Sequence, residues 1–337
     1  MNVNKSLEKK NNIKEPIYHV ATDVYKEARI IRNKYTKLAS LEINTQSKWS
    51  LFAGNSPETI NLDTPIATGK DHGIYPLYVS TSERSYFKLT TDHGEAILSE
   101  TQLPMAGGYN FRDLGGMQSS NGKHIKWGKI FRTDDLYNLT PEDLQYLSSI
   151  PINYVIDFRY KDECSSAPDK FPNGLKKCYS LSIKPGNLLS LRKQEGVTKE
   201  DIIEKMMDLY RIMVSTPDCI AIFKEFFKIM ERGENPLIFH CSAGKDRTGV
   251  AASLLLFSLD IPYKTIMEDY MSSNEYLDDK YLPLFEENPI NKYLYTVRPE
   301  FLESAISEIN KKYGCVQSYL QDVLDVKIDK MKEIYLF

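Results

Sequence analysis

The segment from Pro236 to Phe257 constrains the fold of this chain more than any other part of its sequence. Residues 236–239 are apolar and have the length of a buried strand, and the apolar residues 250–257 are long enough to begin a helix. Between them lies the sequence HCSAGKDRTG, which must form a tight loop. The backbone N–H groups of such a loop converge, and the dipole of the following helix adds partial positive charge. The segment therefore predicts a strand, an anion-binding loop and a helix.

The side chains of this loop indicate chemistry at the anion site. Cys241 lies at the mouth of the loop, where the field that attracts an anion also favours a thiolate. Arg247 has a planar guanidinium that can bind two phosphate oxygens at once, and Thr248 can offer a hydroxyl to the thiolate. His240 is expected to orient the loop. A nucleophile, a fixed cation and a hydroxyl at these offsets predict attack on a phosphate ester.

Two motifs resemble the protein tyrosine phosphatase superfamily. The first is the Cys-x5-Arg spacing within HCSAGKDRTG, and the second is NFRDLGG at residues 110–116, which is typical of the atypical bacterial tyrosine and lipid phosphatases. The resemblance implies that Cys241 attacks phosphorus, that a phosphocysteine forms and is released by water, and that no metal or other cofactor is needed. It also implies an α/β fold with a tyrosine-phosphatase-like central sheet flanked by helices.

A phosphocysteine enzyme also needs an acid for the leaving oxygen and a base for the attacking water. The superfamily usually supplies an Asp from a mobile loop, but no convincing Trp-Pro-Asp occurs here. Asp246 is the first candidate, since it resembles the acidic position of myotubularin-like lipid phosphatases; alternatively, it only orients Arg247. Asp157, at the end of an expected strand, is the second candidate, and its alternative role is a salt bridge with Arg159 or Arg112.

Substrate contacts are expected from the loop and from the NFRDLGG motif. The expected substrate-binding residues are Ser242, Ala243, Gly244, Lys245, Arg112 and Asp113. Of these, Asp113 is expected to frame the site rather than to transfer protons. Lys245 either adds the positive charge that accompanies tolerance of phosphoinositides in similar enzymes, or is a solvated surface lysine. Residues 183–200 form either a lid over the site or an ordinary connection.

The predicted function is hydrolysis of phosphotyrosine, with phosphoserine and phosphothreonine left open. One alternative substrate class is a phosphoinositide or another polyphosphorylated alcohol. The expected partner is therefore a phosphorylated protein or, under this alternative, a phosphoinositide. An alternative of another class is a phosphate-ester-binding interaction module with an inactive catalytic domain. The intact Cys241 and Arg247 argue against that alternative.

Composition shifts divide the chain into three parts. Residues 1–16 are polar and predict a disordered leader, residues 17–104 a β-sandwich-like accessory domain, and residues 105–337 the catalytic domain. Alternating runs separated by turn residues indicate strands at 39–43, 48–52 and 86–90. The aromatic residues of this part form either an exposed binding face or, as we favour, its core. They are Trp49, Phe52, Tyr75, Tyr78, Tyr86 and Phe87.

Strands and helices alternate in the third part, which is typical of an α/β domain. Strands are expected at 127–132 and 153–159. A helix should begin after Thr140, with Pro141 at its first position. Apolar residues recur at helical spacing in further segments. These are 198–214, 217–232, 263–277, 299–313 and 316–331.

Composition limits the remaining function classes. The formal net charge is −3, from 43 basic and 46 acidic residues, which gives no general case for binding nucleic acid. No apolar run is long enough to span a bilayer. The five cysteines show no metal-ligand spacing and no disulfide framework. Without an apolar leader the default expectation is a cytoplasmic protein, with an exported mature form as the alternative; the sequence does not indicate an oligomeric state.

Overall fold

The computed structural model describes residues 28–184 and 196–337. The predicted leader, residues 1–16, lies outside the described residues. So do residues 185–195, which make up most of the segment 183–200 that is expected to form a lid or an ordinary connection. No helix within the described ranges combines the length and the apolar character that a bilayer crossing requires.

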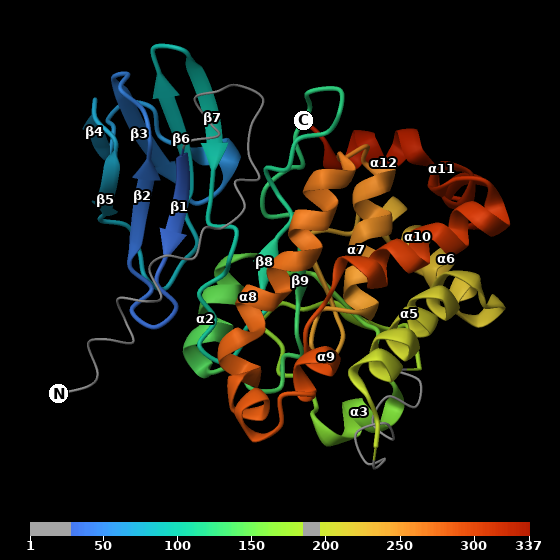
Figure 1. Ribbon diagram of the computed structural model, residues 1–337. Helices are drawn as coiled ribbons and strands as arrows, with labels where there is room; N and C mark the ends of the chain where they lie inside the picture. The colour runs from blue at the N-terminus through green and yellow to red at the C-terminus, as the bar shows by residue number, and fades with distance from the viewer. Residues whose placement is uncertain (1–27, 185–195) are drawn as a thin grey trace.

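The first described part of the chain is all β (Figure 1). Its strands are β1 (Ala28–Arg32), β2 (Ala39–Ile43), β3 (Trp49–Gly54), β4 (Ala67–Gly69), β5 (Gly73–Leu77), β6 (Tyr86–Thr91) and β7 (Gly94–Leu98), with a 3-10 turn, η1 (Pro57–Thr59). One antiparallel sheet has the order β1-β2-β5 and the other β4-β3-β6-β7. Alternate residues of β1 and β2 are buried, as the two-residue period of a strand requires. Leu41 from one sheet and Leu51 and Leu89 from the other belong to one shared core.

The second part is built on a five-stranded sheet with the order β11-β10-β12-β9-β8. Its strands are β8 (Arg112–Asp113), β9 (Ile130–Thr133), β10 (Tyr154–Asp157), β11 (Lys177–Ser180) and β12 (Leu237–His240). Strands β9 to β12 are parallel, and β8 pairs antiparallel with β9. The central strand β12 is buried throughout, with Leu237 and Phe239 in one core and Ile238 in another. The predicted fold class, an α/β sheet flanked by helices and preceded by an all-β part, is confirmed.

Helices cover this sheet (Figure 1). They are α2 (Pro141–Ser149), α3 (Lys161–Ser166), α5 (Lys199–Ser215), α6 (Pro217–Glu231), α7 (Arg247–Ser258), α8 (Tyr263–Glu287), α9 (Asn291–Tyr295), α10 (Pro299–Tyr313), α11 (Val316–Ser318) and α12 (Ile328–Tyr335). Residues of α5, α6, α7 and α10 share the larger core with Phe239, whereas Tyr146 and Leu147 of α2 share the smaller core with Ile238. Strand β12 therefore has helices packed on both faces, and these helices fix the position from which the following loop begins.

Most predicted helix limits agree with the structure, and two differ. Thr140 caps α2 by accepting a hydrogen bond from the Asp143 N–H at 3.2 Å, as its sequence predicts. Helix α8 runs ten residues beyond the expected end at 277, through an interior proline at 283. The single helix predicted over 316–331 is wrong. It is divided into α11, a π-helical turn η2 (Tyr319–Val323) and α12, because Asp325 adopts a left-handed backbone with φ of 59°.

Buried charges join the all-β part to the α/β part. Arg84 donates to Asp113 of the NFRDLGG motif at 2.8 Å, and both side chains are almost fully buried. Lys37, in the turn after β1, donates to the Pro104 carbonyl at 2.7 Å and to Asp143 at 3.0 Å. These contacts tie the scaffold of the predicted site to the preceding sheets.

The aromatic residues of the all-β part have mixed positions. Trp49, Tyr86 and Phe87 are buried, as the core interpretation predicts. Tyr75 is half-buried and packs edge-to-face on Trp49 with ring centroids 4.8 Å apart. Tyr78, in contrast, is 97% exposed and does not belong to the core.

Candidate active site

The loop between β12 and α7 carries the Cys-x5-Arg residues, and its backbone carbonyls are bound from outside. The Asn110 side-chain amide donates to the Ala243 carbonyl at 3.0 Å, and Arg132 donates to the Gly244 carbonyl at 2.7 Å. The Asp135 N–H donates to the Ser242 carbonyl at 3.3 Å. Each of these carbonyls points away from the interior of the loop. Because the N–H and C=O groups of a trans peptide point in opposite directions, the N–H groups between them face the concave side.

Those N–H groups form an anion cradle at the start of α7. Among the residues that the structure describes, the backbone N–H groups of 242–248 donate to no protein oxygen. Gly244 has φ of +66°, and a Cβ placed there would lie 2.2 Å from the Thr133 carbonyl oxygen, so only glycine fits this turn. Unpaired N–H groups at a helix N-terminus bind anions. The predicted strand, tight loop and helix are all present, whereas anion binding by the loop stays a prediction.

Arg247 is fixed beside this cradle by Glu163, a residue that sequence reasoning missed. The two Nη atoms of Arg247 each donate to one Glu163 oxygen at 2.7 Å, and Ser242 Oγ also donates to that carboxylate. Burial lowers the pKa of Arg247, but Glu163 and the Cys241 sulfur raise it above its ordinary value. Glu163 lies in the first turn of the short helix α3, and its only sequence signal is an acidic residue shortly after a strand.

Cys241 and Thr248 are both buried. Cys241 is 2% exposed. Its carbonyl lies 3.2 Å from Nδ1 of His240, so His240 contacts the loop as expected of an orienting residue. The Thr248 hydroxyl is buried and has no hydrogen-bond partner within the described part of the chain. A buried hydroxyl without a partner is costly, so this one is available to a ligand.

Asp246 and Lys245 are paired with each other. Lys245 Nζ lies 2.7 Å and 3.0 Å from the two Asp246 oxygens, and the Lys245 side chain is only 4% exposed. The interpretation of Lys245 as a solvated surface residue is therefore wrong. Tyr210, from α5, donates to Asp246 at 2.8 Å and accepts a bond from Tyr270. Asp246 thus connects the loop to α5 and α8.

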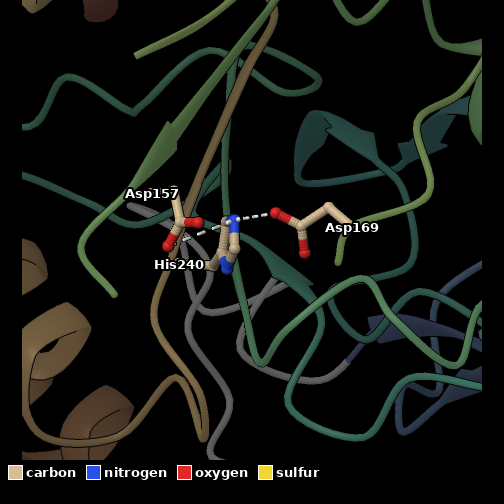
Figure 2. A group of neighbouring side chains, drawn as sticks. All are labelled: Asp157, Asp169 and His240. Atoms are coloured by element: carbon tan, nitrogen blue, oxygen red, sulfur yellow. Dashed lines mark ion pairs between the residues drawn. The ribbon is translucent and has the colours of Figure 1, made fainter. Parts of the chain in front are cut away.

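Asp157 belongs to a buried ionic cluster rather than to the mouth of the loop. Arg159 binds both Asp157 oxygens at 2.9–3.1 Å, which is the salt bridge named as the alternative role. Figure 2 shows His240 between Asp157 and a further carboxylate, Asp169, which sequence reasoning did not single out. His240 Nε2 lies 3.3 Å from Asp169 and 3.9 Å from Asp157.

The charged groups of this cluster shift one another's pKa values. Burial lowers the pKa of His240, but the Asp169 and Asp157 carboxylates raise it above its ordinary value. Burial raises the pKa of Asp157, but His240 and Arg159 lower it below its usual value. The three residues of Figure 2 have the donor types of a metal site. However, the Arg159 guanidinium binds both carboxylates, and this cation occupies the oxygens that a metal ion would need.

The two charged residues of NFRDLGG support the scaffold. Arg112 is fully buried and donates to Asp269 of α8 at 2.7 Å. Asp269 also accepts from Arg132 at 2.6 Å, so it links Arg112 to the residue that holds the Gly244 carbonyl. Asp113 accepts the N–H groups of residues 115 and 128 and the Arg84 guanidinium. Both side chains are fully buried, so neither Arg112 nor Asp113 can contact a substrate directly as expected, and the framing role of Asp113 stays a prediction.

A strand–loop–helix that presents its amides beside a cysteine and a fixed arginine has the form of an anion-binding site. Comparisons with known proteins show the family to which the chain belongs. The model of the tyrosine phosphatase family matches residues 103–336. The chain therefore belongs to the tyrosine phosphatase family, and it is a protein tyrosine phosphatase. Both motifs and all the loop residues discussed above lie within the matched range.

Several relatives are similar to this chain. A Cupriavidus necator protein is 27% identical over 241 residues, covering 67% of this chain and 85% of that protein. A tyrosine-protein phosphatase of Nostoc commune is 31% identical over 160 residues, covering 44% and 49%. The triple specificity protein phosphatase PtpB of Mycobacterium tuberculosis is 23% identical over 280 residues, covering 70% and 98%. The solved structure of Pseudomonas aeruginosa TpbA covers 63% of this chain and 88% of that one at 12% identity with a TM-score of 0.26, a likeness too low for any inference.

Proposed function

We propose that this phosphatase hydrolyses phosphotyrosine through a phosphocysteine on Cys241. The observation that carries the proposal is the loop backbone, whose carbonyls are bound from outside by Asn110, Arg132 and the Asp135 N–H. The amides on the concave side are then preorganised for the oxygens of a transferring phosphoryl group. Preorganised donors of this kind supply most of the acceleration in phosphoryl transfer.

The side chains of the loop have separate roles in this mechanism. Cys241 attacks phosphorus, while Arg247 and the amides of 242–248 bind the equatorial oxygens. The bonds from Arg247 to Glu163 use its Nη atoms, and among the described residues Nε has no recorded acceptor, so it remains for the substrate. The unpaired Thr248 hydroxyl supports a role in stabilising the departing thiolate. Ser242, Ala243, Gly244 and Lys245 line or shape the cradle.

A second candidate substrate is a phosphoinositide or another polyphosphorylated alcohol. The mycobacterial relative is named a triple specificity protein phosphatase, which supports testing more than one substrate class. The pairing of Lys245 with Asp246 weighs against a free cation for a second phosphate at this position. Phosphotyrosine is therefore the better supported substrate.

The test is a substrate panel on Cys241→Ser and on a matched control. Phosphotyrosine peptides, phosphoserine peptides and phosphoinositides are assayed with and without a chelator. Cys241→Ser should lower kcat by about 10³-fold or more while still binding phosphate esters, because the amides and Arg247 remain. Cys219→Ser, which alters another buried cysteine on α6, should keep its activity. Substantial turnover by Cys241→Ser would contradict covalent catalysis by this residue.

A further inference from the structure

The parallel pairing of β9 with β12 places a carboxylate beside the phosphate-binding loop that the motifs do not contain. Thr133 of β9 is in register with His240 of β12. The two segments leave the sheet side by side, so the residues that follow Thr133 lie next to Cys241 and Ser242. The hydrogen bond from the Asp135 N–H to the Ser242 carbonyl fixes this neighbourhood.

Other carboxylates around the loop each form a close ion pair with a lysine or an arginine. Asp246 has Lys245 at 2.7 Å, and Glu163 has Arg247 at 2.7 Å. Asp157 is bound through both oxygens by Arg159, as described above. The oxygens of each of these carboxylates are therefore already engaged in a close ion pair.

Asp134, the neighbour of Asp135, is also held by several close partners. It accepts the N–H groups of Tyr109 and Asn110 at 3.0 Å and 3.1 Å, and it pairs with Lys280 at 2.8 Å. Its side chain is 1% exposed. Asp134 therefore serves to hold the residue, Asn110, that in turn holds the Ala243 carbonyl.

Asp135 differs from all of these in its contacts. One of its oxygens accepts the Tyr137 N–H at 3.2 Å, and the other lies 3.8 Å from Lys280, beyond hydrogen-bond distance. Its side chain is 14% exposed, so it can reach a substrate while being largely shielded from water. Burial and the charge of Asp134 raise the pKa of Asp135, while Lys280 and Arg159 oppose that shift without cancelling it.

We infer that Asp135 is the general acid and base of the phosphatase reaction; the inference rests on the proposed function. In the first step, the Cys241 sulfur bonds to phosphorus as the bond from phosphorus to the tyrosyl oxygen breaks, and the Asp135 carboxyl gives its proton to that oxygen. In the second step, the Asp135 carboxylate takes a proton from water as the water oxygen bonds to phosphorus. The sulfur–phosphorus bond breaks in the same step, which returns the thiolate and releases inorganic phosphate.

Asp135→Asn tests this assignment with two substrates that differ in leaving group. Removal of a general acid costs about 10²–10⁴-fold on a leaving group that needs protonation. Therefore kcat for a phosphotyrosine peptide should fall by about that factor, while kcat for p-nitrophenyl phosphate, whose leaving group needs little protonation, should fall less than about tenfold. The decline of kcat at high pH that marks loss of the acid form should also disappear for the peptide.

Asp246 and Asp157 are the competing candidates for the general acid, so kcat of Asp246→Asn and Asp157→Asn is measured in parallel on the same two substrates. Each should lower the two rates by a similar factor, because loss of an ion pair alters the loop for every substrate. An equal loss on both substrates for Asp135→Asn, or no loss, would overturn the inference. So would the leaving-group-dependent pattern appearing in Asp246→Asn or Asp157→Asn instead.

Failure of the inference can be separated from failure of the proposed function. Rapid quenching of Asp135→Asn with p-nitrophenyl phosphate should still trap a phosphoenzyme, which Cys241→Ser should not form. A phosphoenzyme formed by both variants would contradict the proposed nucleophile and leave no role for Asp135 in the steps above. A urea unfolding midpoint equal to that of the wild type shows that any loss in Asp135→Asn is not a loss of fold.

Discussion

Replacement of Arg84 by Met should destabilise the whole described fold, although Arg84 lies outside the catalytic part. Arg84 is 2% exposed, and its guanidinium binds Asp113 at 2.8 Å, the Glu100 carbonyl at 3.0 Å and the Ser99 hydroxyl at 3.0 Å. Met keeps much of the length of the side chain but removes all of these donors. The Asp113 carboxylate would then remain buried without its cation.

The magnitude follows from the burial of the pair. Removing one partner of a buried ion pair costs about 3–5 kcal/mol, because the other charge is left uncompensated. The N–H groups of residues 115 and 128 still bind Asp113, so the lower end, about 3 kcal/mol, is expected. With a urea m-value of about 3 kcal/mol per molar, this loss lowers the unfolding midpoint by about 1 M.

The two tryptophans provide the assay, since one lies in each part. Trp49 reports on the all-β core, and Trp127 on the catalytic part, where its Nε1 donates to the Ile97 carbonyl at 2.9 Å. Urea titrations in the Trp49→Phe and Trp127→Phe backgrounds should both show the lowered midpoint. The control, Arg29→Met, removes an ion pair with Glu42 whose side chains are 18% and 39% exposed, and should cost less than about 1 kcal/mol. Equal shifts for the two arginine variants would refute the reasoning.

Two further predictions concern the residues that support the loop. Glu163→Gln should lower kcat/KM by about 10- to 100-fold, because a charged hydrogen bond of about 1.5–3 kcal/mol no longer fixes Arg247. The control, Glu142→Gln on an exposed turn of α2, should leave kcat/KM unchanged, and steady-state kinetics of the two variants test this. The raised pKa of His240 means that its ionic contacts stabilise the fold fully below pH of about 6.5 and lose this effect as pH rises through the folded pKa. Asp169→Asn should therefore cost more stability at pH of about 6 than at pH of about 9, and urea midpoints that fall equally at both values would contradict this.

The strands and helices could be predicted wherever a local pattern decides them. The cap at Thr140 and the proline after it begin α2 at the expected residue, and the apolar spacing of 299–313 gives α10 its observed limits. The error at 316–331 arises because apolar spacing continues through η2 and does not reveal the left-handed backbone at Asp325. Periodicity predicts which face of a segment is buried better than it predicts whether the segment is continuous.

The site was predicted only as far as its residues are neighbours in sequence. The loop from His240 to Thr248 was found because its chemistry lies in one short motif. Glu163, Asp169 and Asp135 were missed because each is brought to the loop by a different strand or connection, and nothing near them in the sequence marks that destination. The expectation that Arg112 contacts the substrate is wrong because a motif shows which residues occur together but not which of them are buried.

The close approach of Gly244 to Thr133 has a consequence for anyone who wishes to change what this enzyme accepts. Saturation mutagenesis of the whole loop would include positions that tolerate little change, since residue 244 has no room for a side chain and Ser242 is hydrogen-bonded to Glu163. Ala243 offers more room for variation: its carbonyl is held by Asn110, but its methyl group makes no hydrogen bond that a replacement would break. A focused library at that position, with residues 132 and 133 left untouched, is the sensible first search for altered selectivity.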